Sequence, residues 1–150
     1  MVVLFFSNKI LKATSKIPIQ PYYHDLTTLN EAIIIKMKFN TFRKEVQNIY
    51  RNLKTIDNDL FFTGLSNFKH NWTRLYLKWF KRVDPIGSVL CPESTAIINS
   101  MPNIQTAMFS VLKPGAKILP HRGPYCGCIR LHMGLITPND DNCCRLAQFQ

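Results

Sequence analysis

Residues 107–140 read AMFSVLKPGAKILPHRGPYCGCIRLHMGLITPND, a stretch in which short apolar runs alternate with turn-forming residues. The runs at 106–112, 116–121 and 128–136 are predicted to be strands, since each is brief and bounded by Gly, Pro, Asn or Asp. The turns and loops expected between and after these strands are residues 113–115, 123–127 and 138–142. Short strands separated in this way predict an antiparallel sandwich or barrel.

The residues before this stretch predict mainly helices. A helix is expected over 28–54, because apolar residues recur there at spacings of three and four: Ile35, Phe39, Phe42, Val46, Ile49 and Leu53. A shorter helix is expected over 92–101, where a proline and polar residues begin the segment. Residues 70–82 favour a strand, although a helix would also suit them. Helices first and strands second predict an α+β chain.

Length and charge set broad limits on function. A chain of 150 residues is about one domain. Its net charge of +10 is concentrated in residues 1–82, which contain 14 Lys or Arg residues and 5 Asp or Glu residues. Such a basic half can attract anionic lipid, nucleic acid or acidic substrates, but a solvated lysine-rich helix surface is the more common explanation of such a charge excess. No nucleic-acid-binding motif is present, which disfavours nucleic acid as a partner.

The N-terminus and the cysteines indicate a cellular compartment. The opening MVVLFF is apolar for six residues, which is too short to span a bilayer, and it lacks the order of a signal peptide. We therefore expect a cytoplasmic chain with reduced thiols, with peripheral membrane contact through this basic, apolar end left open. The five cysteines do not have zinc-site spacing, since Cys126 and Cys128 are too close and Cys143 and Cys144 are adjacent.

The strand expected at 128–136 carries an unusual polar pair. Side chains alternate along a strand, so Arg130 and His132 should share one face, and the other face should be apolar throughout. A charge packed on an apolar layer needs a partner, and a carboxylate ligand would supply one through a bidentate Arg contact. The alternative is the exposed polar face of an ordinary amphipathic strand.

His121 ends the expected strand 116–121, just before Arg122-Gly123-Pro124. A histidine at the end of a strand is well placed to bind a metal, because the strand fixes the imidazole while the loop leaves room for a substrate. A lone histidine is more often a surface or hydrogen-bonded residue.

Several motifs in order carry a family resemblance. The run 107–140, together with NWTRLYLKWF (71–80), LCPEST (90–95) and PYYHDL (21–26), resembles the aspartyl/asparaginyl β-hydroxylases over about residues 20–142. It is also similar to the bacterial lipid A hydroxylases. The resemblance implies an Fe(II)- and 2-oxoglutarate-dependent dioxygenase that hydroxylates a peptide Asp/Asn side chain or a lipid acyl chain.

The resemblance also implies a fold and a set of site residues. The fold would be α+β, with N-terminal helices followed by an incomplete double-stranded β-helix (jelly-roll) barrel. Residues 1–27 would form an extended lead-in and residues 28–150 the hydroxylase-like domain. His121 matches the catalytic, iron-binding histidine. Positions that contact 2-oxoglutarate or line its pocket match Trp72, Ser110, Arg130, Leu131 and His132.

Two departures from the family pattern bear on activity. Gly123 stands where the usual two-histidine, one-carboxylate site has its acid; this absence favours the peptide hydroxylases, whereas NWTRLYLKWF and TPNDD favour the lipid branch. The second iron-binding histidine and an arginine for the distal carboxylate of 2-oxoglutarate are expected after residue 150. The competing hypothesis is therefore an inactive remnant whose basic surface binds anionic membrane or nucleic acid.

Overall fold

The computed structural model describes residues 29–52, 72–112, 114 and 128–138, with the side chains at 51–52 and 72–73 excepted. The lead-in at 1–27, the strand expected at 116–121 and the turn expected at 138–142 lie wholly or mostly outside these residues. The expected division of the chain at residues 27 and 28 is not tested and stays a prediction.

The expected helix over 28–54 is two helices, α2 (Asn30–Met37) and α3 (Phe39–Asn52). They meet at Lys38, whose backbone lies at φ −93° and ψ 15°, between helical and extended geometry. Three consecutive isoleucines precede this break, and β-branched residues are poor helix formers. The predicted apolar stripe is confirmed on α3, where Phe42, Val46 and Ile49 are buried.

Within the described residues, three antiparallel strands form one sheet in the order β2-β1-β3. They are β1 (Trp72–Trp79), β2 (Arg82–Val83) and β3 (Ala107–Leu112). The strand predictions at 70–82 and 106–112 are thus confirmed. Leu75 pairs with Phe109 in register, and both are buried. The alternation of side chains then turns Ser110 to the opposite face, where it is exposed.

A bulge in β1 changes which side chains the strand buries. The register shifts between Tyr76 and Lys78, so Leu77 is an extra residue opposite β3. Lys78 is consequently buried, and its ammonium group donates to the carbonyl oxygen of Met101 at 3.2 Å. Strict alternation predicts Trp79 on the buried side with Leu75, but Trp79 is 48% exposed.

A tight turn joins β1 to β2. Trp79 pairs with Arg82, so the loop consists of Phe80 and Lys81 alone. Both have positive φ, 44° and 67°, a conformation that a residue with a Cβ atom adopts at a cost of about 1–2 kcal/mol. The Lys81 N–H donates to the carbonyl oxygen of Gln105 at 2.9 Å, which holds this turn against the segment before β3.

Two short helices follow the hairpin, α4 (Pro85–Leu90) and α5 (Pro92–Asn99). The helix predicted at 92–101 is confirmed as α5. The Asp84 carboxylate accepts from the Gly87 N–H at 2.8 Å and begins α4. Gly87 is buried, and a Cβ there would lie 2.1 Å from the carbonyl oxygen of Tyr76. The missing side chain therefore lets α4 pack on the β1 backbone.

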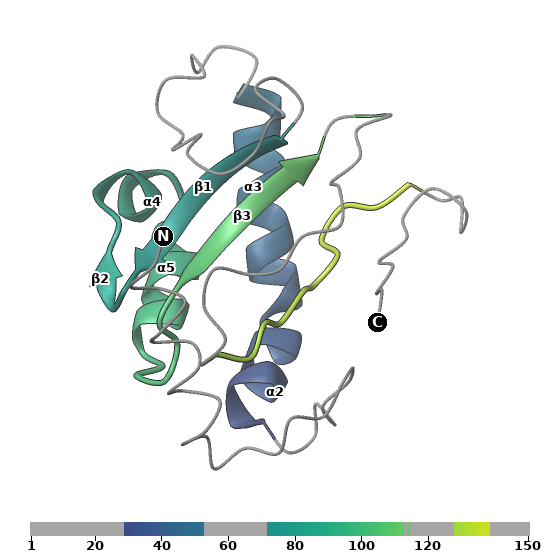
Figure 1. Ribbon diagram of the computed structural model, residues 1–150. Coiled ribbons are helices and arrows are strands. Elements are labelled where there is room, and N and C mark those ends of the chain that lie inside the picture. Colours follow the sequence, from purple (N-terminus) through teal and green to yellow (C-terminus); the bar gives the residue numbers. More distant parts are fainter. Residues whose placement is uncertain (1–28, 53–71, 113, 115–127, 139–150) are drawn as a thin grey trace, which may run out of the picture.

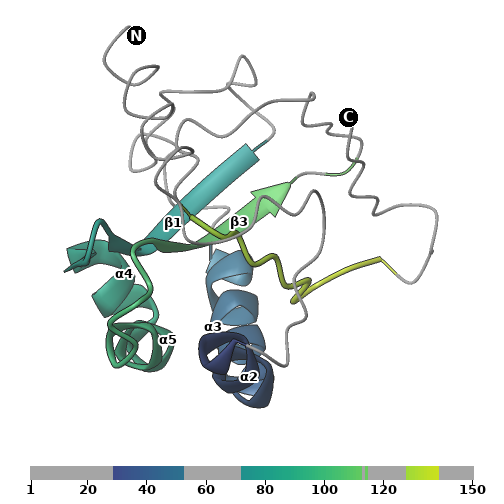
Figure 2. The same cartoon turned by 60° about the horizontal axis from the view of Figure 1, so that its bottom comes forward.

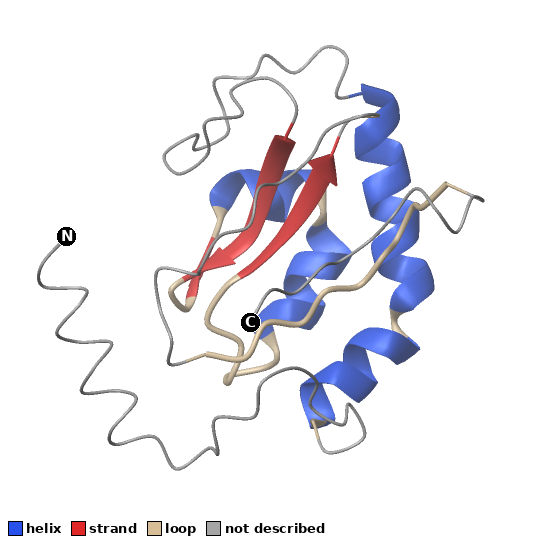
Figure 3. Ribbon diagram, turned by 45° about the vertical axis from the view of Figure 1, so that its right-hand side comes forward, coloured by secondary structure: helices blue, strands red, loops and turns tan. Residues whose placement is uncertain are grey.

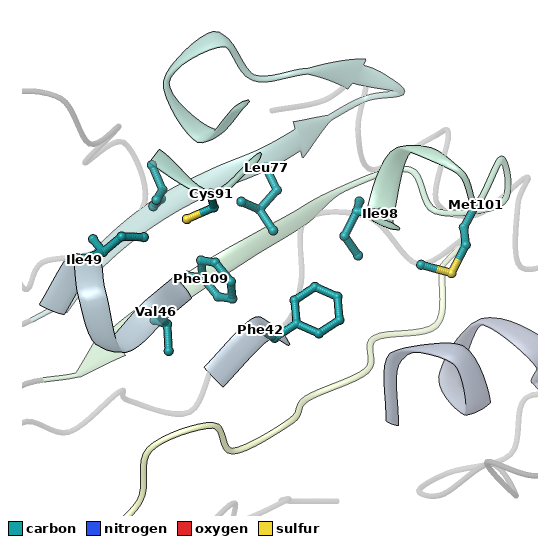
Figure 4. Close-up of a cluster of buried hydrophobic side chains, with 9 residues drawn as sticks. Phe42, Val46, Ile49, Leu77, Cys91, Ile98, Met101 and Phe109 are labelled. Carbon is teal, nitrogen blue, oxygen red and sulfur yellow. The ribbon is translucent and has the colours of Figure 1, made fainter. Parts of the chain in front are cut away.

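Helices and sheet form two layers. Figure 2 shows α3, α4 and α5 on one side of β1 and β3, with α2 beside α3. Figure 4 shows the buried side chains between these layers, among them an edge-to-face pair of Phe42 and Phe109 with centroids 6.4 Å apart. The core members are Phe42, Val46, Ile49, Leu75, Leu77, Cys91, Ile98, Met101 and Phe109. None of the helices in the described ranges is long and apolar enough to cross a membrane.

The strand expected at 128–136 is wrong, since residues 128–138 have no strand assignment. This segment runs beside β3 and across α3 (Figures 1 and 3). Met133 and Leu135 pack against the core, but Ile129 and Leu131 remain 41% and 39% exposed. A strand requires a backbone partner, and the described residues provide none here. The α+β class is confirmed; the sheet is open, and the jelly-roll barrel is not shown.

Candidate functional site

The face of the sheet turned away from the helices brings together residues from two expected site segments. Arg74 of β1 lies directly opposite Ser110 of β3, and Tyr76 lies opposite Met108. Trp72 pairs with Leu112, which makes its register position diagonal to Ser110. The positions of Trp72 and Ser110, distant in sequence, are thus neighbours on adjacent strands.

Arg74 was not among the expected site residues. It is half-buried, and its register partner Ser110 is exposed. The signal was present in NWTRLY, because Arg74 stands two positions after Trp72 and therefore shares its parity along a strand. The guanidinium adds a permanent positive charge beside the predicted co-substrate position.

The second group of expected residues lies on the 128–138 segment. Arg130, Leu131 and His132 are all exposed there, outside any strand. The segment was expected to have one polar face and one buried apolar face. Leu131 is exposed like Arg130 and His132, so this expectation is not met. Their side chains are accessible to a ligand, but the described structure shows no contact that joins them to Ser110.

The metal site is not tested by the structure. His121, its predicted ligand, lies outside the described residues. Among the residues that are described, no three His, Cys, Asp or Glu side chains are grouped so that they could hold an ion. The thiol of Cys91 is buried, and that of Cys128 is exposed.

A buried polar cluster beneath the sheet anchors α5 and was not predicted. The Glu45 carboxylate of α3 accepts from the backbone N–H groups of Glu93 and Ser94, at 3.0 and 2.8 Å. These N–H groups belong to the first turn of α5, where helices present unpaired donors and positive potential. Glu45 therefore ties α3 to α5, and both helices cover the core face of the sheet.

Cys91 immediately precedes α5 and lies in the same cluster. Burial, and secondarily the negative charge of Glu45, raises the pKa of the Cys91 thiol to about 12. The thiol is therefore neutral at physiological pH. A neutral, fully buried thiol behaves as a small apolar side chain, which fits its place in the core and gives it no nucleophilic role.

Comparison with known proteins relates the chain to a described family. Residues 36–148 match the sequence model of a family described as Aspartyl/Asparaginyl beta-hydroxylase. The match includes β1, β3, His121 and residues 128–138, and hence every expected site residue. No solved structure matches the chain.

Two curated proteins are similar to most of the chain. An ornithine lipid ester-linked acyl 2-hydroxylase from Rhizobium tropici is 32% identical over 114 residues, which are 76% of this chain and 36% of that protein. Aspartate beta-hydroxylase domain-containing protein 2 from Homo sapiens is 26% identical over 129 residues, which are 82% of this chain and 35% of that protein. The chain thus spans little more than a third of the length of these relatives.

Proposed function

Because the chain belongs to the aspartyl/asparaginyl β-hydroxylase family, we propose that it carries the co-substrate-binding part of an Fe(II)- and 2-oxoglutarate-dependent hydroxylase. The observation that carries this proposal is the family match over residues 36–148, which contains all six expected site residues. The inactive-remnant alternative has no comparable support from the comparisons.

The described residues suit the anionic co-substrate. 2-Oxoglutarate carries two carboxylates, which arginine binds through paired N–H donors. Arg74 and Ser110 stand opposite each other on the face of the sheet turned away from the described helices, and Arg130 and His132 are exposed on the segment beside β3. We propose that these residues bind and orient 2-oxoglutarate, with Trp72 and Leu131 as its apolar neighbours. A jelly-roll barrel would enclose this face.

The described residues do not fit a complete iron site. They include no group of three candidate ligands, and Gly123 occupies the position of the usual carboxylate. His121 is the proposed iron ligand of this chain. When bound, iron with 2-oxoglutarate supplies the oxidising chemistry for hydroxylation; the residues of this chain bind the co-substrate and exclude water from it.

For the substrate, we propose a lipid acyl chain. The more similar of the two relatives is the one whose name specifies a lipid acyl group, at 32% identity against 26%. Hydroxylation of a peptide Asp or Asn side chain is the second candidate, since this chain has Gly123 in place of the usual carboxylate and that absence favours the peptide hydroxylases.

The proposal is tested by the release of succinate from 2-oxoglutarate. The 150-residue chain and a version extended through the downstream coding sequence are assayed with Fe(II), with and without a chelator. We expect chelator-sensitive succinate release from the extended protein. An absence of succinate from both proteins would overturn the proposal.

A further inference from the structure

The tip of the β1–β2 hairpin is a second surface feature, separate from the proposed co-substrate residues. Three aromatic rings form a continuous edge-to-face series there. The centroids of Tyr76 and Trp79 are 4.8 Å apart, and those of Trp79 and Phe80 are 4.9 Å apart. Trp79 is 48% and Phe80 65% exposed, so this aromatic series ends in solvent.

Basic residues flank the exposed rings. Lys81 and Arg82 follow Phe80 directly, both are exposed, and neither forms an ion pair with any residue in the described part of the chain. The nearest acid in sequence, Asp84, is occupied by the Gly87 N–H at the start of α4. Exposed Val83 and Ile86 extend the apolar surface beyond the hairpin.

The backbone holds this tip in a conformation that does not suit its sequence. Two-residue hairpin loops with positive φ favour Asn and Gly, whereas Phe80 and Lys81 occupy both positions here. Hydrogen bonds from the Lys81 N–H to Gln105 and from the Phe80 N–H to Thr106 fix the turn. Strained residues that the surrounding structure holds in place are often functional. Folding alone does not require an aromatic ring at this tip.

We propose that the hairpin tip, residues 79–82, docks the protein on an anionic membrane surface. Trp and Tyr rings are favoured at the boundary between headgroups and acyl chains. Lys and Arg are attracted to the negative potential of anionic lipids. The tip presents both kinds of side chain within four residues, and Phe80 is the more exposed of its two rings. Rings already fixed in place lose little conformational freedom on docking.

This surface differs from the N-terminal segment expected to contact membranes, which lies outside the described residues. It is also independent of the proposed activity, because docking needs neither iron nor 2-oxoglutarate. A failure to bind vesicles would therefore leave the hydroxylase proposal intact, and a failure of turnover would leave the docking proposal intact.

The test is cosedimentation of the full 150-residue chain with vesicles of phosphatidylcholine containing phosphatidylglycerol, and with vesicles of phosphatidylcholine alone. We expect binding to the anionic vesicles that weakens as salt is added. Phe80→Asn should lower the partition coefficient about tenfold through lost apolar contact. Lys81→Ser with Arg82→Ser should lower it about 30-fold, since each basic residue near an anionic surface contributes about a factor of five.

Matched variants separate docking from folding and from general charge. Phe80→Asn should leave the melting temperature unchanged or raised, because Asn tolerates positive φ better than Phe. Met37→Ser removes an apolar residue of α2 that is even more exposed than Phe80, and Lys44→Ser removes an exposed charge from α3; both should bind like the wild type. The proposal is overturned if the wild-type chain does not bind anionic vesicles, or if the tip variants bind them no more weakly than these controls do.

Discussion

Glu45 offers the sharpest test of how the helical layer is held together. Substitution by Ala removes both acceptors of the Glu93 and Ser94 N–H groups, which lie 3.0 and 2.8 Å from the carboxylate oxygens. Hydrogen bonds to a charged group contribute about 1.5–3 kcal/mol each. The Glu93 N–H is only partly buried, so water recovers some of its bond. We therefore expect Glu45→Ala to lower the free energy of unfolding by about 3 kcal/mol.

Urea unfolding, followed by circular dichroism and tryptophan fluorescence, measures this loss from the shift in midpoint at constant slope. Glu45→Gln keeps one acceptor oxygen but turns an NH₂ group toward the second donor, and should lose about half as much. The control Glu93→Gln changes an exposed acid at the same helix end and should stay within about 0.5 kcal/mol of the wild type. A Glu45→Ala protein within that range too would refute the anchoring role of Glu45.

Further results are expected from three single substitutions and from one labelling experiment. Gly87→Ala should destabilise the protein by about 1–3 kcal/mol in the same unfolding assay, since its Cβ would overlap the Tyr76 carbonyl and α4 would have to move off β1; wild-type stability would contradict this close packing. The raised pKa of Cys91 means that an unfolded thiol, ionising near 9.0, loses its proton before the folded one, so its contribution to stability is full below pH 9 and falls as the pH rises toward about 12. Cys91→Ala should make the free energy of unfolding less dependent on pH between about 9 and 12. In the folded wild-type protein, iodoacetamide should label Cys128 and spare Cys91, as measured by mass spectrometry. Equal labelling of the two thiols would contradict the burial of Cys91. In calorimetric titrations of the extended protein, Arg130→Ala should weaken 2-oxoglutarate binding by about 10- to 100-fold through loss of a charge-assisted contact, with the exposed Arg43→Ala as the unaffected control; equal affinities would remove Arg130 from the site.

Sequence patterns predicted the elements that have long, regular periodicity. The stripe of Phe42, Val46 and Ile49 predicted the buried face of α3, and the β1 and β3 strands followed from alternation and turn residues. The bulge at Leu77 was missed, because it depends on how β1 pairs with β3 rather than on a local pattern. The break at Lys38 was missed, because the apolar spacing continues across it even though the three isoleucines before it are poor helix formers. Helix α4 has only six residues, too few for a period, although Asp84-Pro85 is a recognisable helix start.

The candidate site was predictable to a smaller extent. Family resemblance placed Trp72 and Ser110 in one pocket, and the register of β1 and β3 brings their positions together. Alternation wrongly assigned Arg130 and His132 to a strand, because alternation describes a face only when a neighbouring strand pairs with it. The turn at the hairpin tip was not predicted, because Phe80 and Lys81 lack the Asn-Gly sequence typical of such turns.

The most direct test of hydroxylation supplies the extended protein with Fe(II), 2-oxoglutarate and isotopically labelled dioxygen in the presence of an acyl-chain lipid. Mass spectrometry then follows both succinate and the lipid. We expect one labelled oxygen atom in the acyl chain and one in succinate, with neither product formed when 2-oxoglutarate is omitted. Label in a peptide aspartate or asparagine instead would move the substrate to the second candidate, and no labelled product of either kind would contradict the hydroxylase proposal.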